Sequence, residues 1–211
     1  RDGIDTEMIA ASINTLEFQL REYNTGSFPR GIAVMLSALI ASSRPVIVTG
    51  CVTDFKEQEI VLDAFVTVMK RFTDALLILA PRHPEVGERM EKLRASLEQR
   101  GLSVVFKSAL KEDLPFAART TCMVLDTMGE LRDFYASATV AHVGVDHNVL
   151  EPLAFGKPVT VLPGWDATYP SYPVYRLLMD TTMLLEADRA GALSDHWLRL
   201  LEQPLHYRDR M

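Results

Sequence analysis

Arg82 and His83 have the side-chain types that recognise a phosphate group. They stand between two prolines, directly before a charged stretch with helical spacing. A guanidinium, an imidazole and the free backbone N–H groups of a helix start together suit a phosphate. The same residues also fit a plain turn, with Glu85 favourably placed at the helix start and both basic groups in solvent. The spacing is compatible with both interpretations.

A second cluster follows an apolar run that ends near residue 125, and it consists of Thr127, Met128, Gly129 and Glu130. Thr127 as an N-cap with Glu130 three residues later predicts a capping box, which explains both residues without a ligand. Gly129 is harder to explain in this way, because glycine weakens a helix and is useful where a ligand or another backbone comes close. The cluster therefore predicts either a capped helix start or a turn that lies against a ligand.

The third cluster contains His147, Asn148 and Glu151, at the start of a short stretch with helical spacing. The two oxygens of a carboxylate can accept hydrogen bonds from both hydroxyls of a nucleotide ribose. A solvated glutamate at a helix start explains Glu151 equally well. The residue types thus permit a nucleotide site without requiring one.

The stretches between these clusters predict the elements that position them. Apolar runs with little polar alternation are typical of strands buried on both faces of a parallel sheet, and helices of period 3.6 join such strands. We therefore predict a Rossmann-like, doubly wound α/β fold, in which ligands bind at the carboxyl ends of the strands. The predicted strands cover residues 46–50, 75–80, 103–107, 122–126, 140–144 and 158–162, and the predicted helices cover residues 57–72, 85–100, 129–137, 150–155 and 188–201.

Residues 1–44 do not follow this alternation of strands and helices, and they are predicted to form a helical extension or an interdomain linker. Apolar residues at helical spacing between positions 9 and 20 predict one helix, and residues 32–40 predict a second, largely buried one. Residues 45–211 are predicted to form the Rossmann-like domain, with a nucleotide or phosphate site at the carboxyl edge of its sheet.

Composition and missing motifs exclude several classes of protein. The chain has 22 Lys and Arg against 28 Asp and Glu, a formal net charge of −6, so we predict no nucleic-acid partner. The sequence contains no P-loop, HExxH, GxGxxG or nucleophile elbow, and we predict no metal and no cofactor. Cys51 and Cys122 are expected to be buried, reduced thiols, and His142 a core residue. His196 and His206 are expected at the surface.

Four motifs in register over residues 45–163 resemble the C-terminal half of bacterial 3-deoxy-D-manno-octulosonic acid (Kdo) transferases. They read PVIVTG, LLILAPRHPE, LDTMGEL and HNVLEPLAFGKPV. The resemblance implies a GT-B glycosyltransferase whose C-terminal half binds the donor CMP-Kdo and which transfers Kdo to a lipid A precursor in lipopolysaccharide biosynthesis. It also implies residue roles: a donor-phosphate contact for Arg82 and His83, a nucleotide contact for Met128, Gly129 and Glu130, and phosphate and ribose contacts for His147, Asn148 and Glu151.

The sequence departs from the family pattern in two loops. The family has a Ser-Thr-His segment where residues 51–54 read CVTD, and a longer glycine-rich loop where residues 143–146 read VGVD. Fewer backbone N–H groups are then expected around a phosphate. Two alternatives stay open: a non-catalytic, degenerate GT-B-like binding module, or another nucleotide-sugar enzyme such as a UDP-sugar transferase or epimerase.

The resemblance covers only the donor half of the family's architecture. The acceptor half, with the carboxylate that serves as general base and the membrane anchor, has no counterpart in these residues, so we predict no catalytic residue in this chain and no transfer by the chain alone. Because the sequence opens at Arg1 rather than Met, we expect either a processed start or a piece of a longer protein. Its expected location is the cytoplasm, at the cytoplasmic face of the inner membrane through the missing half.

Overall fold

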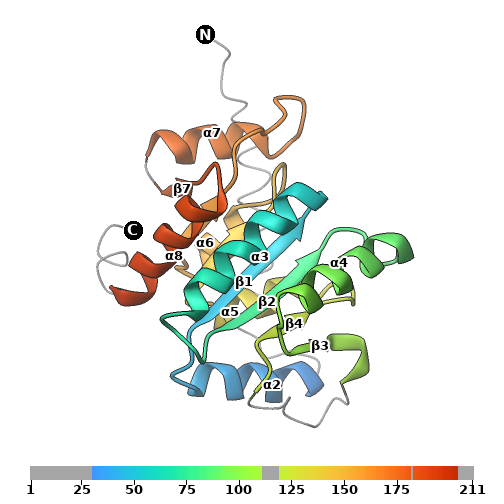
Figure 1. Cartoon of the computed structure of the whole chain (residues 1–211). Coiled ribbons are helices and arrows are strands. Elements are labelled where there is room, and N and C mark those ends of the chain that lie inside the picture. The colour runs from blue at the N-terminus through green and yellow to red at the C-terminus, as the bar shows by residue number, and fades with distance from the viewer. Residues whose placement is uncertain (1–29, 111–118, 182, 204–211) are drawn as a thin grey trace.

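The computed structural model shows a parallel β-sheet with helices on both faces, and it describes residues 30–110, 119–181 and 183–203 (Figure 1). The seven strands lie in the order β3-β4-β2-β1-β5-β6-β7, and every neighbouring pair is parallel. This architecture confirms the predicted fold class. The strands are β1 (Val46–Val52), β2 (Leu76–Pro81), β3 (Val104–Phe106), β4 (Cys122–Val124), β5 (Val140–Val143), β6 (Val159–Val161) and β7 (Leu184–Glu186).

Two groups of helices cover the two faces of the sheet. The front group in Figure 1 consists of α3 (Phe55–Met69), α4 (Gly87–Gln99) and α8 (Ala190–Glu202). The opposite face is covered by α2 (Arg30–Ala41), α5 (Leu131–Ser137), α6 (Leu150–Ala154) and α7 (Tyr172–Asp180). A short 3₁₀ turn, η1 (Lys107–Ala109), follows β3.

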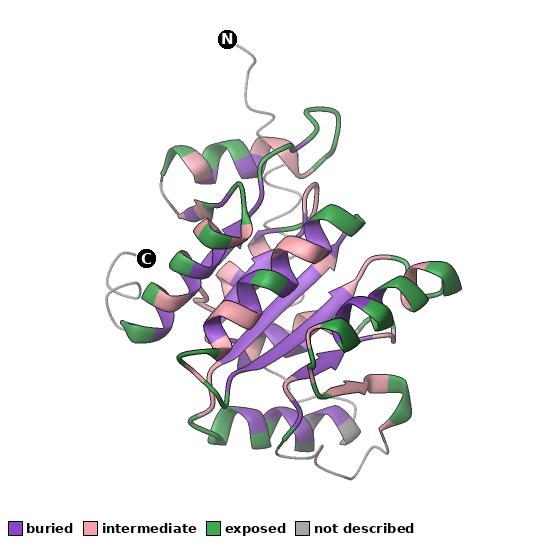
Figure 2. Ribbon diagram, in the orientation of Figure 1, coloured by how far each residue is buried: buried purple, intermediate pink, exposed green. Residues whose placement is uncertain are grey.

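The strands are largely apolar because each face of the sheet packs against helices. Ile47 and its neighbour Leu77 lie in the core cluster under α3 and α8, whereas Val48 and Ile78 lie in the cluster on the other face. Figure 2 shows the five inner strands buried almost along their whole length, whereas β3 and β7 at the two edges of the sheet are only partly buried. Burial on both faces removes the polar alternation that a half-exposed strand needs.

β1 lies at the point where the strand order reverses. β2 pairs with one edge of β1, and β5, which comes much later in the chain, pairs with the other edge. The connections that leave β1 and β5 therefore run to opposite faces of the sheet. In open α/β sheets a ligand binds at such a point, outside the carboxyl ends of the strands.

The six predicted strands are all observed, while α7, β7 and η1 were not predicted. Two of these elements are only three residues long, and so carry little periodic signal. Gly101 has the left-handed φ of 64° expected just after a helix end, as predicted. The helix predicted over residues 32–40 is observed as α2, but the prediction that it is largely buried is wrong: Ile32 and Met35 join the core cluster, whereas the opposite side, with Ile40, is exposed. The helix predicted between positions 9 and 20 and the position of His206 lie outside the described residues.

No helix in the described part of the chain has the length and apolar character needed to cross a bilayer.

Candidate ligand-binding site at the carboxyl edge of the sheet

The turn that ends β1 packs unusually tightly against the turn that ends β5. The backbone N–H of Gly144 donates to the carbonyl of Gly50 over 2.8 Å, and a Cβ on Gly144 would lie 2.7 Å from the carbonyl carbon of Cys51. Cys51 itself has a left-handed φ of 57°. A Cβ on Gly50 would overlap the hydroxyl of Tyr135 in α5. Only glycine fits these two positions, so they hold the two turns in close contact.

Three of the predicted residues gather around Cys51. Arg82, which follows β2, and Glu151 in α6 both affect the pKa of the Cys51 thiol, Arg82 lowering it and Glu151 raising it. Arg82 also lowers the pKa of His147, which follows β5. The fold thus brings side chains from three separate segments to one place at the switch point of the sheet.

Glu151 is half-buried, and burial raises the pKa of its carboxyl group above its ordinary value. The positive charge of Arg132 and a hydrogen bond from Asn148 lower the pKa again, but burial is the larger effect. The Asn148 amide nitrogen lies 3.5 Å from Glu151 Oε1, and its Oδ1 accepts a hydrogen bond of 3.0 Å from the N–H of Leu150. Asn148 therefore fixes the start of α6 and faces the carboxylate at the same time.

His147 has one ring nitrogen engaged and one available. Its Nδ1 lies 2.8 Å from the carbonyl oxygen of Val145, to which it donates. Burial lowers the pKa of the imidazole from its ordinary value of 6.5, so the ring is neutral at neutral pH and Nε2 carries a lone pair. This state suits a ligand hydroxyl, and it leaves Arg82 as the positive charge available to a phosphate.

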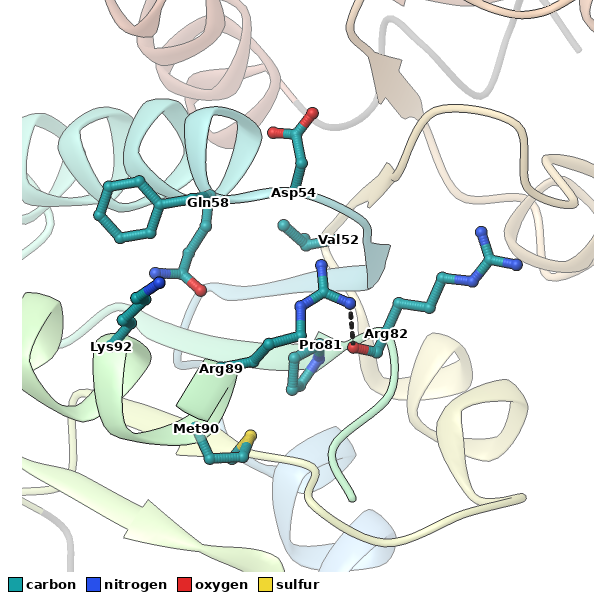
Figure 3. Close-up of a pocket in the computed structure, with 9 residues that line it drawn as sticks. Val52, Asp54, Gln58, Pro81, Arg82, Arg89, Met90 and Lys92 are labelled. Atoms are coloured by element: carbon teal, nitrogen blue, oxygen red, sulfur yellow. Dashed lines mark hydrogen bonds between the residues drawn. The ribbon is translucent and has the colours of Figure 1, made fainter. Parts of the chain in front are cut away.

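Arg82 is held by its backbone and leaves its side chain unpaired. Its N–H donates to the carbonyl of Val52 over 3.0 Å, and its carbonyl accepts from Arg89 over 3.2 Å. Arg82 is one of the residues that line the cavity of Figure 3, and there its guanidinium extends away from Arg89. The guanidinium takes part in no ion pair of the described residues. It is thus free to bind an anion.

His83 and the turn that contains Met128 take other positions at this edge. His83 has a left-handed φ of 57°, is exposed, and pairs with Glu85 over 3.0 Å rather than with Arg82. Met128 is 80% exposed, and Glu130 accepts from the hydroxyl of Thr127 and lies 3.4 Å from Lys107 Nζ. The structure brings neither group into contact with Glu151.

The capping box predicted at Thr127 is wrong. Helix α5 begins at Leu131 with Glu130 as its N-cap, and no side chain caps it. Gly129, with a left-handed φ of 87°, turns the chain out of the helical path and delays the helix start. Thr127 instead donates its hydroxyl to the Glu130 carboxylate.

Two residues that sequence reasoning missed, Glu57 and Arg89, lie beneath the loops. Glu57 is only 4% exposed and accepts from the N–H groups of Thr53 and Val145. Arg89 donates to the carbonyls of Thr53 and Arg82. The pattern of an Asp54 N-cap followed three residues later by Glu57 is a helix-start signal that could have drawn attention to Glu57. No local signal indicates Arg89.

Two cavities flank the group of residues around Cys51. One of about 360 Å³ lies between the ends of β1, β5 and β6, and its lining includes Thr53, Lys56 and Asp146. Another of about 120 Å³ lies between α3 and α4 and is lined by Phe55, Gln58, Met90 and the cationic residues Arg89 and Lys92 (Figure 3). The larger one is within the size range of small-molecule sites.

Cys51 is half-buried rather than fully buried, while Cys122 and His142 are buried as predicted and His196 is half-buried.

Burial raises the pKa of the Cys51 thiol to about 11. Because the thiolate is the nucleophile, a pKa of about 11 instead of 9.0 lowers its fraction at about pH 8 by ~100-fold. We expect correspondingly slow alkylation of Cys51 in the native chain and rapid alkylation in denaturant, followed by mass spectrometry. Native alkylation at the rate of a free thiol would contradict this environment.

No family model matches the chain, but curated relatives do. The Kdo transferase of Haemophilus influenzae is 28% identical over 182 residues, which are 83% of this chain and 40% of that protein. The Aquifex aeolicus enzyme is 32% identical over 109 residues, 49% of this chain and 28% of its own length. These matches confirm the resemblance to Kdo transferases. The chain spans less than half the length of the relatives that it matches.

Solved structures confirm the fold. The C-terminal CMP-Kdo binding domain of WaaA from Acinetobacter baumannii superposes with a TM-score of 0.71 at 24% identity, over 84% of this chain and 90% of that chain. The C-terminal domain of a group 1 glycosyltransferase, LpcC, from Francisella tularensis gives a TM-score of 0.56 at 12% identity, over 84% of this chain and 85% of that chain. The described residues thus have the fold of the C-terminal half of a GT-B glycosyltransferase.

Proposed function

We propose that this chain is the donor-binding half of a Kdo-transferase-like glycosyltransferase, and that the carboxyl edge of its sheet binds CMP-Kdo. The observation that supports this most is the meeting of Arg82, His147 and Glu151 around the end of β1. These are residues of the motifs that resemble the family, and they offer a cation, a neutral imidazole and a carboxylate. That set matches the phosphate and the hydroxyls of a nucleotide.

In this proposal each side chain binds the part of the donor that its chemistry suits. Arg82 binds the CMP phosphate and stabilises the negative charge that grows on it when its bond to the sugar breaks. Glu151 accepts hydrogen bonds from the ribose hydroxyls, and His147 Nε2 accepts from a donor hydroxyl. The turn of Met128 and Gly129 lies against the cytosine.

Transfer itself also needs groups that this proposal assigns to the other half of the protein. The acceptor hydroxyl must lose its proton as it attacks the sugar, and a general base serves that step. We place this base, the site for the lipid A precursor and the contact with the cytoplasmic face of the inner membrane in the acceptor half. The chain alone is then expected to bind the donor without transferring the sugar.

Calorimetry with CMP, UMP and CMP-Kdo tests the proposed donor site. We expect heat of binding for CMP and CMP-Kdo, and affinity for UMP at least about tenfold lower, because the two bases differ in their donor and acceptor groups. Preference for UMP would favour a UDP-sugar enzyme. A folded chain that gives no heat with any of them into the low millimolar range would refute the proposal and favour a degenerate binding module.

A further inference from the structure

Glu57 joins the two loops that meet at the switch point of the sheet. Its Oε2 accepts a hydrogen bond of 2.9 Å from the N–H of Thr53, after β1, and its Oε1 accepts one of 3.2 Å from the N–H of Val145, after β5. The two donors are far apart in sequence, and the carboxylate that joins them is almost completely buried. Charged hydrogen bonds in a buried place are the strong kind.

The start of helix α3 does not need Glu57 for its own capping. Asp54 is the N-cap, and its Oδ1 accepts from the N–H of Glu57 over 2.7 Å. The side chain of Glu57 is therefore available for hydrogen bonds with the loop backbone. Its contacts lie with loop backbone, directly beneath the turn that carries Cys51 and close to His147.

Arg89 in α4 joins the same β1 loop to the loop after β2. Its guanidinium donates to the carbonyl of Thr53 and, over 3.2 Å, to the carbonyl of Arg82, a bond that Figure 3 shows. The backbone N–H of Thr53 thus donates to Glu57, and its carbonyl accepts from Arg89. One residue of backbone is held from both sides by side chains of opposite charge.

We propose that Glu57 and Arg89 are positioning residues for the donor site, which set the mutual geometry of the loops that carry Cys51, Arg82 and His147. This inference rests on the proposed function for its ligand, but the loop geometry can be measured without one. In this role neither side chain contacts the ligand. They act through the backbone of Thr53, Arg82 and Val145.

A buried polar chain lies behind Glu57. His142 Nε2 lies 3.6 Å from Glu57 Oε1, and its Nδ1 lies 3.1 Å from the hydroxyl of Thr160. Trp197 in α8 donates its indole N–H to the same hydroxyl over 3.0 Å. His142, Thr160 and Trp197 are fully buried. The 3.6 Å between His142 Nε2 and Glu57 Oε1 is longer than a hydrogen bond, and His142 Nε2 has no hydrogen-bond partner among the described residues, so the chain stops short of the carboxylate.

The first test compares Glu57→Gln with Glu59→Gln on the same helix. An amide keeps the shape of Glu57 but offers one acceptor oxygen, so it leaves one loop N–H facing an NH₂ group. We expect CMP affinity to fall about tenfold, as for loss of a charged acceptor. Glu59 pairs with Arg100, away from the loops, and Glu59→Gln should leave CMP affinity unchanged.

The second test compares Arg89→Met with Arg94→Met on the same helix. Arg89→Met should weaken CMP binding about as much as Glu57→Gln, because Thr53 and Arg82 lose a shared donor. Arg89→Lys, which can reach only one carbonyl at a time, should recover part of the loss. Arg94 lies over the ring of Phe106 in β3, and Arg94→Met should bind CMP as the unaltered chain does.

Amide hydrogen exchange separates a positioning role from general stability and does not need the ligand. Glu57→Gln should speed exchange at Thr53 and Val145 while the amides in the centre of β1 and β5 keep their protection. Unchanged exchange at those two amides, or CMP affinity equal to that of the control variants, would overturn the inference. If the unaltered chain binds no CMP, the proposed function fails, and the exchange result alone then decides whether Glu57 holds the loops.

Discussion

Glu151→Ala will weaken CMP binding by about 1–3 kcal/mol, which is about fivefold to 150-fold in the dissociation constant. The reason is that the half-buried carboxylate faces the donor site and, in the proposed role, accepts from the ribose hydroxyls. Calorimetry on the unaltered and altered chains measures the change. A dissociation constant within a factor of about two of the unaltered one would show that Glu151 does not contact the nucleotide.

Glu151→Gln should raise the stability of the folded chain at neutral pH, although loss of the carboxylate weakens CMP binding. Burial raises the pKa of Glu151 above 4.5, so the folded chain binds the proton more tightly than the unfolded chain does. The free energy of unfolding therefore falls as pH rises through the interval between 4.5 and the raised pKa, and stays lowered above it. Glu151→Gln, which carries no charge, should be more stable than the unaltered chain at neutral pH and equal to it below the ordinary pKa. Thermal unfolding at both pH values tests this.

Gly144→Ala will disrupt the site and destabilise the fold by about 3 kcal/mol, the upper part of the usual range for overpacking. The new Cβ would overlap the backbone carbonyl of Cys51, and backbone cannot rotate away as a side chain can. For a chain of this size the loss corresponds to a fall in Tm of roughly 6–12 °C. CMP binding should be lost with it, because Cys51 and His147 lie on the two turns that are pushed apart.

Two further substitutions test whether overlap of the new Cβ with the Cys51 carbonyl causes the loss of stability in Gly144→Ala. Gly191→Ala in α8, where a Cβ meets nothing within 4 Å, should be neutral or slightly stabilising. Gly50→Ala should be destabilising as well, but Tyr135→Phe should relieve part of it, because the hydroxyl of Tyr135 is the nearest obstacle. No such relief is available to Gly144→Ala. An unfolding midpoint for Gly144→Ala equal to that of Gly191→Ala would mean that the two turns are less tightly packed than described.

The sequence was sufficient to predict the parallel sheet and the edge that carries the candidate site. Both follow from local patterns, since strands such as residues 46–50 and 75–80 are apolar on both faces and helices of regular period lie between them. Once such strands are parallel, their carboxyl ends share one edge, so residues as far apart as Arg82 and Glu151 had to lie at the same side. Periodicity did not predict β7, which has only three residues, or α7, which has a proline in its first turn.

Side-chain partners were decided by contacts between distant segments. The spacing around His83 and Glu85 could not show that they pair with each other instead of with a phosphate site. The spacing around Thr127 and Glu130 favoured a helix cap, and only the left-handed Gly129 showed why the helix starts later. In both places several local arrangements have similar energies, and the surrounding structure selects one.

By itself, the sequence determined the fold class, the edge of the sheet that carries the site, and the residue types available there, because these depend on the order of apolar and polar residues along the chain. Only the tertiary structure decided that Arg82, His147 and Glu151 meet around Cys51. It also decided that Glu57 and Arg89 form hydrogen bonds with the backbone of the loops at this site. The bond between Glu57 and Val145 joins positions 88 residues apart, and no local pattern encodes it. Such bonds form only when the packed sheet has brought the loops together.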